Sequence, residues 1–118
     1  MANETLIKQY LAGAAIAACR IVKFDTTDGT VIQAAAAADL SIGVCGFVAP
    51  ASGERVDIVQ QGIAEVEFGG VVARGAMVTA DANGKGVAAA STNRTIGIAL
   101  VTTAAGDIAP VLLAPSVM

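Results

Sequence analysis

Acidic pairs are the residues of this 118-residue sequence that are best placed to do chemistry. Asp25 and Asp28 flank a predicted turn, and Glu65 and Glu67 alternate with apolar residues along "IAEVEF". Two convergent carboxylates could hold a cation or act as general acid and general base. The sequence contains no histidine, so the commonest general base and a common zinc ligand are missing. Because alternating glutamates also suit a half-exposed strand, we expect no catalytic, metal or cofactor site.

The other reactive or charged residues point to no ligand either. Cys19 and Cys45 are too few for a zinc framework, and we favour buried thiols over a disulfide because free cysteine is among the most often buried residue types. The glycine-rich "GGVVARGA" lacks the Lys-Ser/Thr of a phosphate-binding loop. The net charge is −3, with the seven lysines and arginines scattered singly, so we expect no nucleic-acid partner. No apolar run approaches the roughly 18 residues of a membrane span, and we expect no membrane partner.

Short β-branched runs separated by turn residues dominate the rest of the chain. "RIVKF" and "TVIQ" flank a turn that contains Gly29, and "AMVTADANGKGVAAA" repeats this plan around Gly84. Both turns predict hairpins, since glycine tolerates the positive φ of a tight turn. Further predicted strands are "SIGVCGFV", "RVDIVQQG", "IAEVEF", "TIGIALVTT" and "DIAPVLLAP". With at most a short helical turn at 34–39, the sequence predicts an all-β fold, a compact sandwich or barrel-like roll.

An internal duplication relates the two parts of the chain. "GAAIAACRIVKFD" at 13–25 matches "GGVVARGAMVTAD" at 69–81, and "SIGV" at 41–44 matches "TIGI" at 95–98. Gly43 and Gly97 occupy equivalent positions in the second pair, whereas Cys19 stands where Gly75 stands in the first. Self-similarity of this kind indicates a repeated structural unit. We therefore predict one domain over 13–118, built from halves at about 13–66 and 67–118.

The opening stretch "LAGAAIAAC" could be read as an export signal that ends in a lipoprotein-type cysteine. Its flanks lack the positive n-region of a signal, and its counterpart lies in mid-chain, so a structural role is favoured. Residues 1–12 show no counterpart in the second half. We interpret them as an N-terminal arm, mobile by itself and ordered on a partner. The expected contact residues of this arm are Asn3, Glu4, Thr5, Leu6 and Ile7.

The segment 62–114 contains a G-x-x-V-T-x-D-x-x-G-K pattern, followed by an Ala-rich stretch, an I-G-x-A strand and a G-D turn. The residues of this pattern are Gly75, Val78, Thr79, Asp81, Gly84 and Lys85, followed by Ile96, Gly97, Ala99, Gly106 and Asp107. In this pattern the segment resembles the small capsid cement, or head decoration, proteins of tailed bacteriophages.

The resemblance implies a structural rather than an enzymatic function. Cement proteins bind the outer surface of the expanded head, typically as homotrimers, and bridge neighbouring subunits of the major capsid protein. The implied location is therefore the outer surface of a virion, and the implied partners are the major capsid protein and further copies of this chain. The alternative is a self-assembling module of a fibre or surface layer that is not a head protein.

Overall fold

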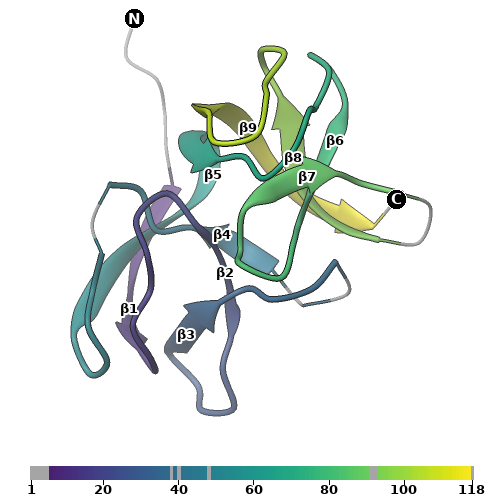
Figure 1. The fold of residues 1–118 in the computed structure, drawn as a ribbon. Coiled ribbons are helices and arrows are strands. Elements are labelled where there is room, and N and C mark those ends of the chain that lie inside the picture. Colours follow the sequence, from purple (N-terminus) through teal and green to yellow (C-terminus); the bar gives the residue numbers. More distant parts are fainter. Residues whose placement is uncertain (1–5, 38, 40, 48, 91–92, 118) are drawn as a thin grey trace, which may run out of the picture.

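The computed structural model describes residues 6–37, 39, 41–47, 49–90 and 93–117, and this part of the chain is all-β, as predicted. No described residue is helical, and none of the described elements is a helix that could cross a membrane. The strands are β1 (Leu6–Ala12), β2 (Ile21–Phe24), β3 (Thr30–Gln33), β4 (Ser41–Val44), β5 (Arg55–Glu67), β6 (Met77–Ala80), β7 (Gly86–Ala88), β8 (Arg94–Ala99) and β9 (Ile108–Val117). Hydrogen-bonded neighbours in the sheet lie in the order β1-β3-β2-β4-β5-β9-β8-β6-β7 (Figure 1).

The first five strands close into a barrel because β1 pairs with both β3 and β5. Both predicted hairpins are present, since β2 pairs antiparallel with β3 and β6 pairs antiparallel with β7. We call residues 6–61 the first unit. Closure removes the unpaired edges that an open sheet would expose.

Strand β5 is shared between two parts of the molecule. Its first part pairs with β1 as far as Gln61, and its second part pairs with β9 from Gly62 onward. The sequence predicts two strands here, "RVDIVQQG" and "IAEVEF", but the structure has one strand of 13 residues. The polar Gln60-Gln61-Gly62 does not end the strand, because backbone pairing passes there from one partner to the other. We call residues 62–113 the second unit.

The second unit repeats the plan of the first. Its strands run in the order β5-β9-β8-β6-β7, and an isolated bridge between Phe68 and Gly86 brings the ends of this arrangement together. Strands β2 and β3 correspond to β6 and β7 at an offset of 56 residues, as expected from the sequence match. The backbone turn before β2 also repeats. Cys19 has a φ of 59° and Gly75 a φ of 89°, so a cysteine adopts the left-handed conformation that glycine supplies in the second unit.

Residues 6–12 are a correction to the sequence interpretation, because they form β1 and are not an arm. Tyr10 and Ala12 are 6% and 1% exposed, and Ile7–Leu11 pair with Val59–Arg55. Their counterpart is the second part of β5, which lies 56 residues later and pairs in the same antiparallel way with β9. This counterpart is not apparent in the sequence because it runs on without a break from the last strand of the first barrel. Asn3, Glu4 and Thr5 lie outside the described residues.

Two clusters of buried apolar side chains form the core. One fills the first unit and includes Val22 and Ile58, and the other includes Val78 and Val111 at the equivalent places in the second unit. The second cluster also contains Ile21 and further residues from the outside of the first unit. The two units are therefore held together by apolar packing as well as by the shared strand.

Candidate functional site

Neither acidic pair belongs to a metal-binding group in the described part of the chain. Across the described ranges, no group of three or more Cys, Asp or Glu side chains is arranged to hold a metal ion. Asp25 accepts a hydrogen bond from the backbone N–H of Thr26 at 2.8 Å, and Asp28 lies on an exposed turn. Glu65 and Glu67 face outward from β5 while Ala64, Val66 and Phe68 are buried, as the alternation in "IAEVEF" predicts.

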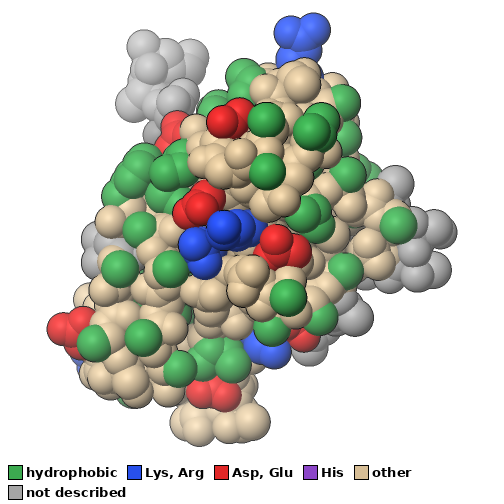
Figure 2. Space-filling view, viewed as in Figure 1, with side chains coloured by type: hydrophobic (Ala, Val, Ile, Leu, Met, Phe, Trp, Pro, Cys, Tyr) green, Lys and Arg blue, Asp and Glu red, His purple; other side chains and the backbone are tan. Residues whose placement is uncertain are grey.

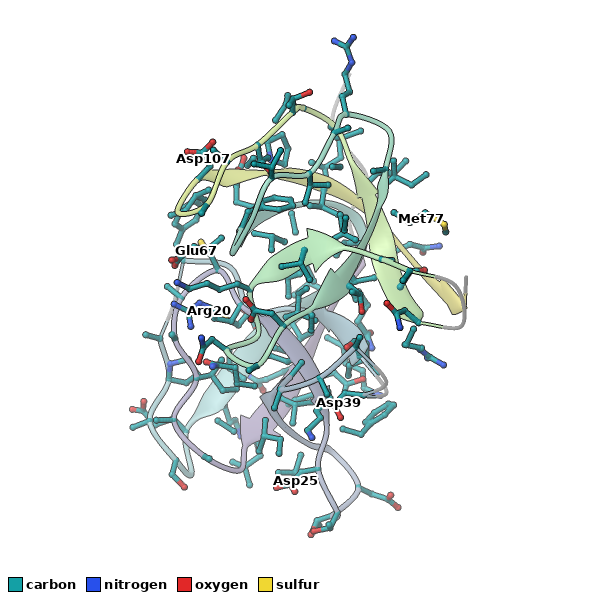
Figure 3. All side chains as sticks on the ribbon, turned by 45° about the vertical axis from the view of Figure 1, so that its right-hand side comes forward. Arg20, Asp25, Asp39, Glu67, Met77 and Asp107 are labelled. Atoms are coloured by element: carbon teal, nitrogen blue, oxygen red, sulfur yellow. The ribbon has the colours of Figure 1, made fainter. Side chains whose placement is uncertain are left out.

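Glu67 instead holds the two units together. Its carboxylate lies 3.3 Å from the guanidinium of Arg20 and 3.3 Å from the Nζ of Lys85. The same guanidinium donates to the carbonyl of Asn83 at 3.0 Å. Acidic and basic side chains lie side by side at the centre of the face in Figure 2, and Figure 3 shows Arg20 next to Glu67. The cluster joins the start of β2 to the β6–β7 hairpin, which is a structural role.

Replacing Glu67 with glutamine is expected to make the thermal stability less dependent on pH in the acidic range. Burial raises the pKa of Glu67, but the hydrogen bonds and charges of Lys85 and Arg20 outweigh burial and hold that pKa below its ordinary value. A lowered folded-state pKa stabilises the protein above the unfolded-state pKa, and this stabilisation is lost as the pH falls through the folded-state pKa. Melting temperatures measured from about pH 7 to about pH 3 should therefore converge for wild type and Glu67→Gln at the acidic end.

Glu65→Gln is the matched control for this experiment. Glu65 lies on the same outer side of β5 and takes part in no ion pair within the described part of the chain. The melting temperature of the Glu65→Gln variant should follow that of the wild type at every pH. A Glu67→Gln profile that stays parallel to wild type would show that the Arg20–Glu67–Lys85 cluster contributes no pH-dependent stability.

The two cysteines are buried and unpaired. Cys19 and Cys45 are 1% and 3% exposed and form no disulfide, which confirms the expectation of buried thiols. Burial is the main cause that raises the pKa of each thiol. Since the thiolate is the reactive form of cysteine, neither residue is suited to act as a nucleophile.

The four glycines singled out in the sequence are needed for two different structural reasons. Gly29 and Gly84 lie in the hairpin turns with φ values of 77° and 72°. Gly43 and Gly97 lie inside β4 and β8, where a Cβ would collide with the backbone carbonyls of Val59 and Leu112 respectively. In both units, this strand therefore has a glycine where the backbone of its neighbour approaches too closely for a side chain.

Gly84→Ala is expected to destabilise the protein more than Gly29→Ala. Both substitutions place a side chain in the left-handed region, at a cost of about 1–2 kcal/mol. A Cβ at Gly84 would in addition meet the carbonyl oxygens of Ala34 and Ile21 at 3.1 and 3.2 Å, whereas a Cβ at Gly29 has nothing within 4 Å. Chemical denaturation of both variants measures the difference. Equal losses would mean that the tip of the β6–β7 hairpin does not pack against the first unit.

An uncharged row of apolar side chains crosses the outer side of the second unit, and sequence reasoning missed it. Ile63 pairs with Leu112, Leu112 with Ile98, and Ile98 with Met77. Directly paired residues place their side chains on the same face of a sheet. Ile63 and Leu112 are 41% and 42% exposed, and the other two are half-buried. We call these four residues the outer row. "DIAPVLLAP" is apolar at nearly every position, so its alternation does not reveal which side faces outward.

The same row exists in the first unit, where most of it is buried. Ile7 pairs with Val59, Val59 with Val44, and Val44 with Ile21. Val44 and Ile21 are fully buried, and Val59 packs against the core of the second unit. Only Ile7 is exposed in this row, at 53%. Of the five predicted contact residues, Ile7 is therefore a described and accessible apolar side chain, on a paired strand rather than an arm.

Comparisons with known proteins give a fold but no family. No protein-family model matches the chain, and no curated protein matches it significantly. The structure is similar to the crystal structure of the head fiber gp8.5 N base of bacteriophage phi29, with a TM-score of 0.71 over 98% of this chain and 98% of that chain. The two sequences are 16% identical, so the likeness is one of fold.

Proposed function

We propose that this chain is a structural, non-catalytic protein of a tailed-phage head that binds the outer surface of the expanded capsid as a cement protein. The observation that carries the proposal is the likeness, over nearly the whole chain, to the base of a phage head fiber. It agrees with the independent resemblance of residues 62–114 to head decoration proteins. The partners would be the major capsid protein and, as the resemblance implies, further copies of this chain in a homotrimer.

The surface of the chain suits a binding role. Nine large apolar side chains among the described residues are exposed, including Ile7, Val71 and Phe47. Scattered apolar residues are ordinary on a protein surface, but the outer row groups such residues side by side. Apolar area of this kind is stabilising when a partner covers it.

Stabilisation of the head would follow from selective binding. A protein that binds the expanded lattice but not the unexpanded one lowers the free energy of the expanded state by its binding free energy at every site. Each site can be modest in affinity, since linked sites within one oligomer raise the effective concentration of the others.

Co-sedimentation tests this proposal. The purified chain is mixed with expanded heads that lack it and, separately, with unexpanded shells, and bound copies are counted per capsid subunit. Saturable binding to expanded heads alone is expected. Binding to neither, together with extended assemblies of the chain by itself, would instead favour the alternative of a fibre or surface-layer module.

A further inference from the structure

Because the two units repeat, each has an equivalent end and an equivalent outer side. Inside the chain, the end of the second unit packs on the outer side of the first, so the end of the first unit and the outer side of the second stay uncovered. Within the chain, the second unit contributes Ala64, Ala80 and Leu113, which pack in one cluster with Ile21 and Val44 on the outside of the first unit. Strand β4 lies against β8 and β9 at this contact. The contact is therefore formed by one end of the second unit and the outer side of the first.

The first unit has an end of the same kind, on which Lys8 and Phe24 are exposed, Gln60 is half-buried and Tyr10 is buried beneath them. The positions equivalent to Ala64, Ala80 and Leu113 are Lys8, Phe24 and Gln60, which surround Tyr10. Phe24 is 49% exposed and packs edge-on against the Tyr10 ring at 6.5 Å. Lys8 lies over the same ring, with its Nζ at 5.4 Å from the ring centre, and Gln60 donates to the Tyr10 hydroxyl at 2.8 Å. We call these four residues the end face.

The matching outer side of the second unit is the outer row, with Met77 and Leu112 in the places of Ile21 and Val59. Met77 lies at the right-hand edge of Figure 3, whereas Asp25, the neighbour of Phe24, lies at the bottom. The two uncovered surfaces therefore lie on different sides of the molecule. One copy cannot bring its own end face onto its own outer row.

We propose that copies of this chain associate head to tail, with the end face of one copy on the outer row of the next. Inside the chain, the row of the first unit is covered by the end of the second unit. The outer row of the second unit is therefore covered by the end face of a second copy of the chain. Charge supports this pairing, since Lys8 lies on the end face and Glu65 follows Ile63 on the outer side of β5. A head-to-tail contact closes into a ring when its rotation allows and otherwise forms a filament.

Two single substitutions and their mixture test the proposal without any capsid. Leu112→Asp disables the outer row, Phe24→Asp disables the end face, and Val71→Asp is the control because Val71 is 74% exposed and belongs to neither surface. In analytical ultracentrifugation, wild type and Val71→Asp should form oligomers. Leu112→Asp and Phe24→Asp should each sediment as single chains of 11.6 kDa.

The mixture of the two defective variants is the decisive sample. Each variant keeps one intact surface, so the mixture should form dimers and nothing larger. Single chains only in the mixture would overturn head-to-tail association, as would a wild type that stays monomeric or oligomers that survive both substitutions. Thermal melts verify that the variants fold. The milder single substitutions Leu112→Ala and Phe24→Ala introduce no charge, and each should raise the dissociation constant of the contact between copies at least about tenfold.

The outcome is separable from that of the capsid-binding test. Monomeric wild type that still binds expanded heads would remove the contact between copies, and with it the proposed homotrimer, but would leave the proposed binding to the capsid in place. Oligomers that form as described but bind no head would leave the contact between copies in place and remove the proposed binding to the capsid.

Discussion

Gly97→Ala is expected to lower the free energy of unfolding by about 3 kcal/mol, the top of the usual range for overpacked interiors. A Cβ at position 97 would collide with the carbonyl oxygen of Leu112 and approach the Leu113 Cα to 3.0 Å. These are backbone atoms of the paired strand β9, so no rotamer change can relieve the contact. Urea denaturation followed by circular dichroism measures the loss.

Gly70→Ala is the matched control for Gly97→Ala. Gly70 has an ordinary φ, and the nearest atom to an added Cβ is the Val87 Cγ1 at 3.9 Å. This variant should unfold within about 0.5 kcal/mol of wild type. If Gly97→Ala were equally mild, the paired strands β8 and β9 could not lie as close together at Gly97 as the structure has them.

The position of Gly97 shows what the repeat alone could predict. Matching "SIGV" to "TIGI" identified Gly43 and Gly97 as equivalent and structurally important. It did not reveal why, since a glycine in a turn and a glycine at a close approach of a paired strand look alike in sequence. Only the partner strand, which lies elsewhere in the chain, distinguishes a steric requirement from a conformational one.

The hairpins and the burial of "IAEVEF" could be predicted because their signals are local. Positive-φ turn residues and a period-two alternation are contained within a few neighbouring positions. The role of residues 6–12 could not be predicted in this way. Their partners on β5 lie some fifty positions later, and an isolated short strand gives no sign of the partner that closes a barrel. The outer row was hidden for the same reason, because its four members come from four strands.

Phe68→Ala is expected to destabilise the protein by about 3–5 kcal/mol, the usual cost of removing a buried aromatic ring. Phe68 is fully buried, and its bridge to Gly86 brings together the two ends of the second unit's strand order. A Cβ added at Gly86 would meet the Phe68 ring carbons at 3.1 Å, so glycine there makes room for the ring. Truncation should therefore leave a cavity between β5 and β7 that the paired backbone cannot collapse to fill.

Phe47→Ala provides the comparison, since Phe47 is 70% exposed and its loss should change the free energy of unfolding by no more than about 0.5 kcal/mol. Differential scanning calorimetry on both variants separates the two cases. Two phenylalanines of equal size would then differ in effect only through burial. Melting temperatures that fall equally for both variants would contradict the assignment of Ala64, Val66 and Phe68 to the inward-facing side of β5 and its continuation. That assignment also sets which residues of β5 point outward, so the same result would remove Ile63 from the outer row and weaken the head-to-tail contact.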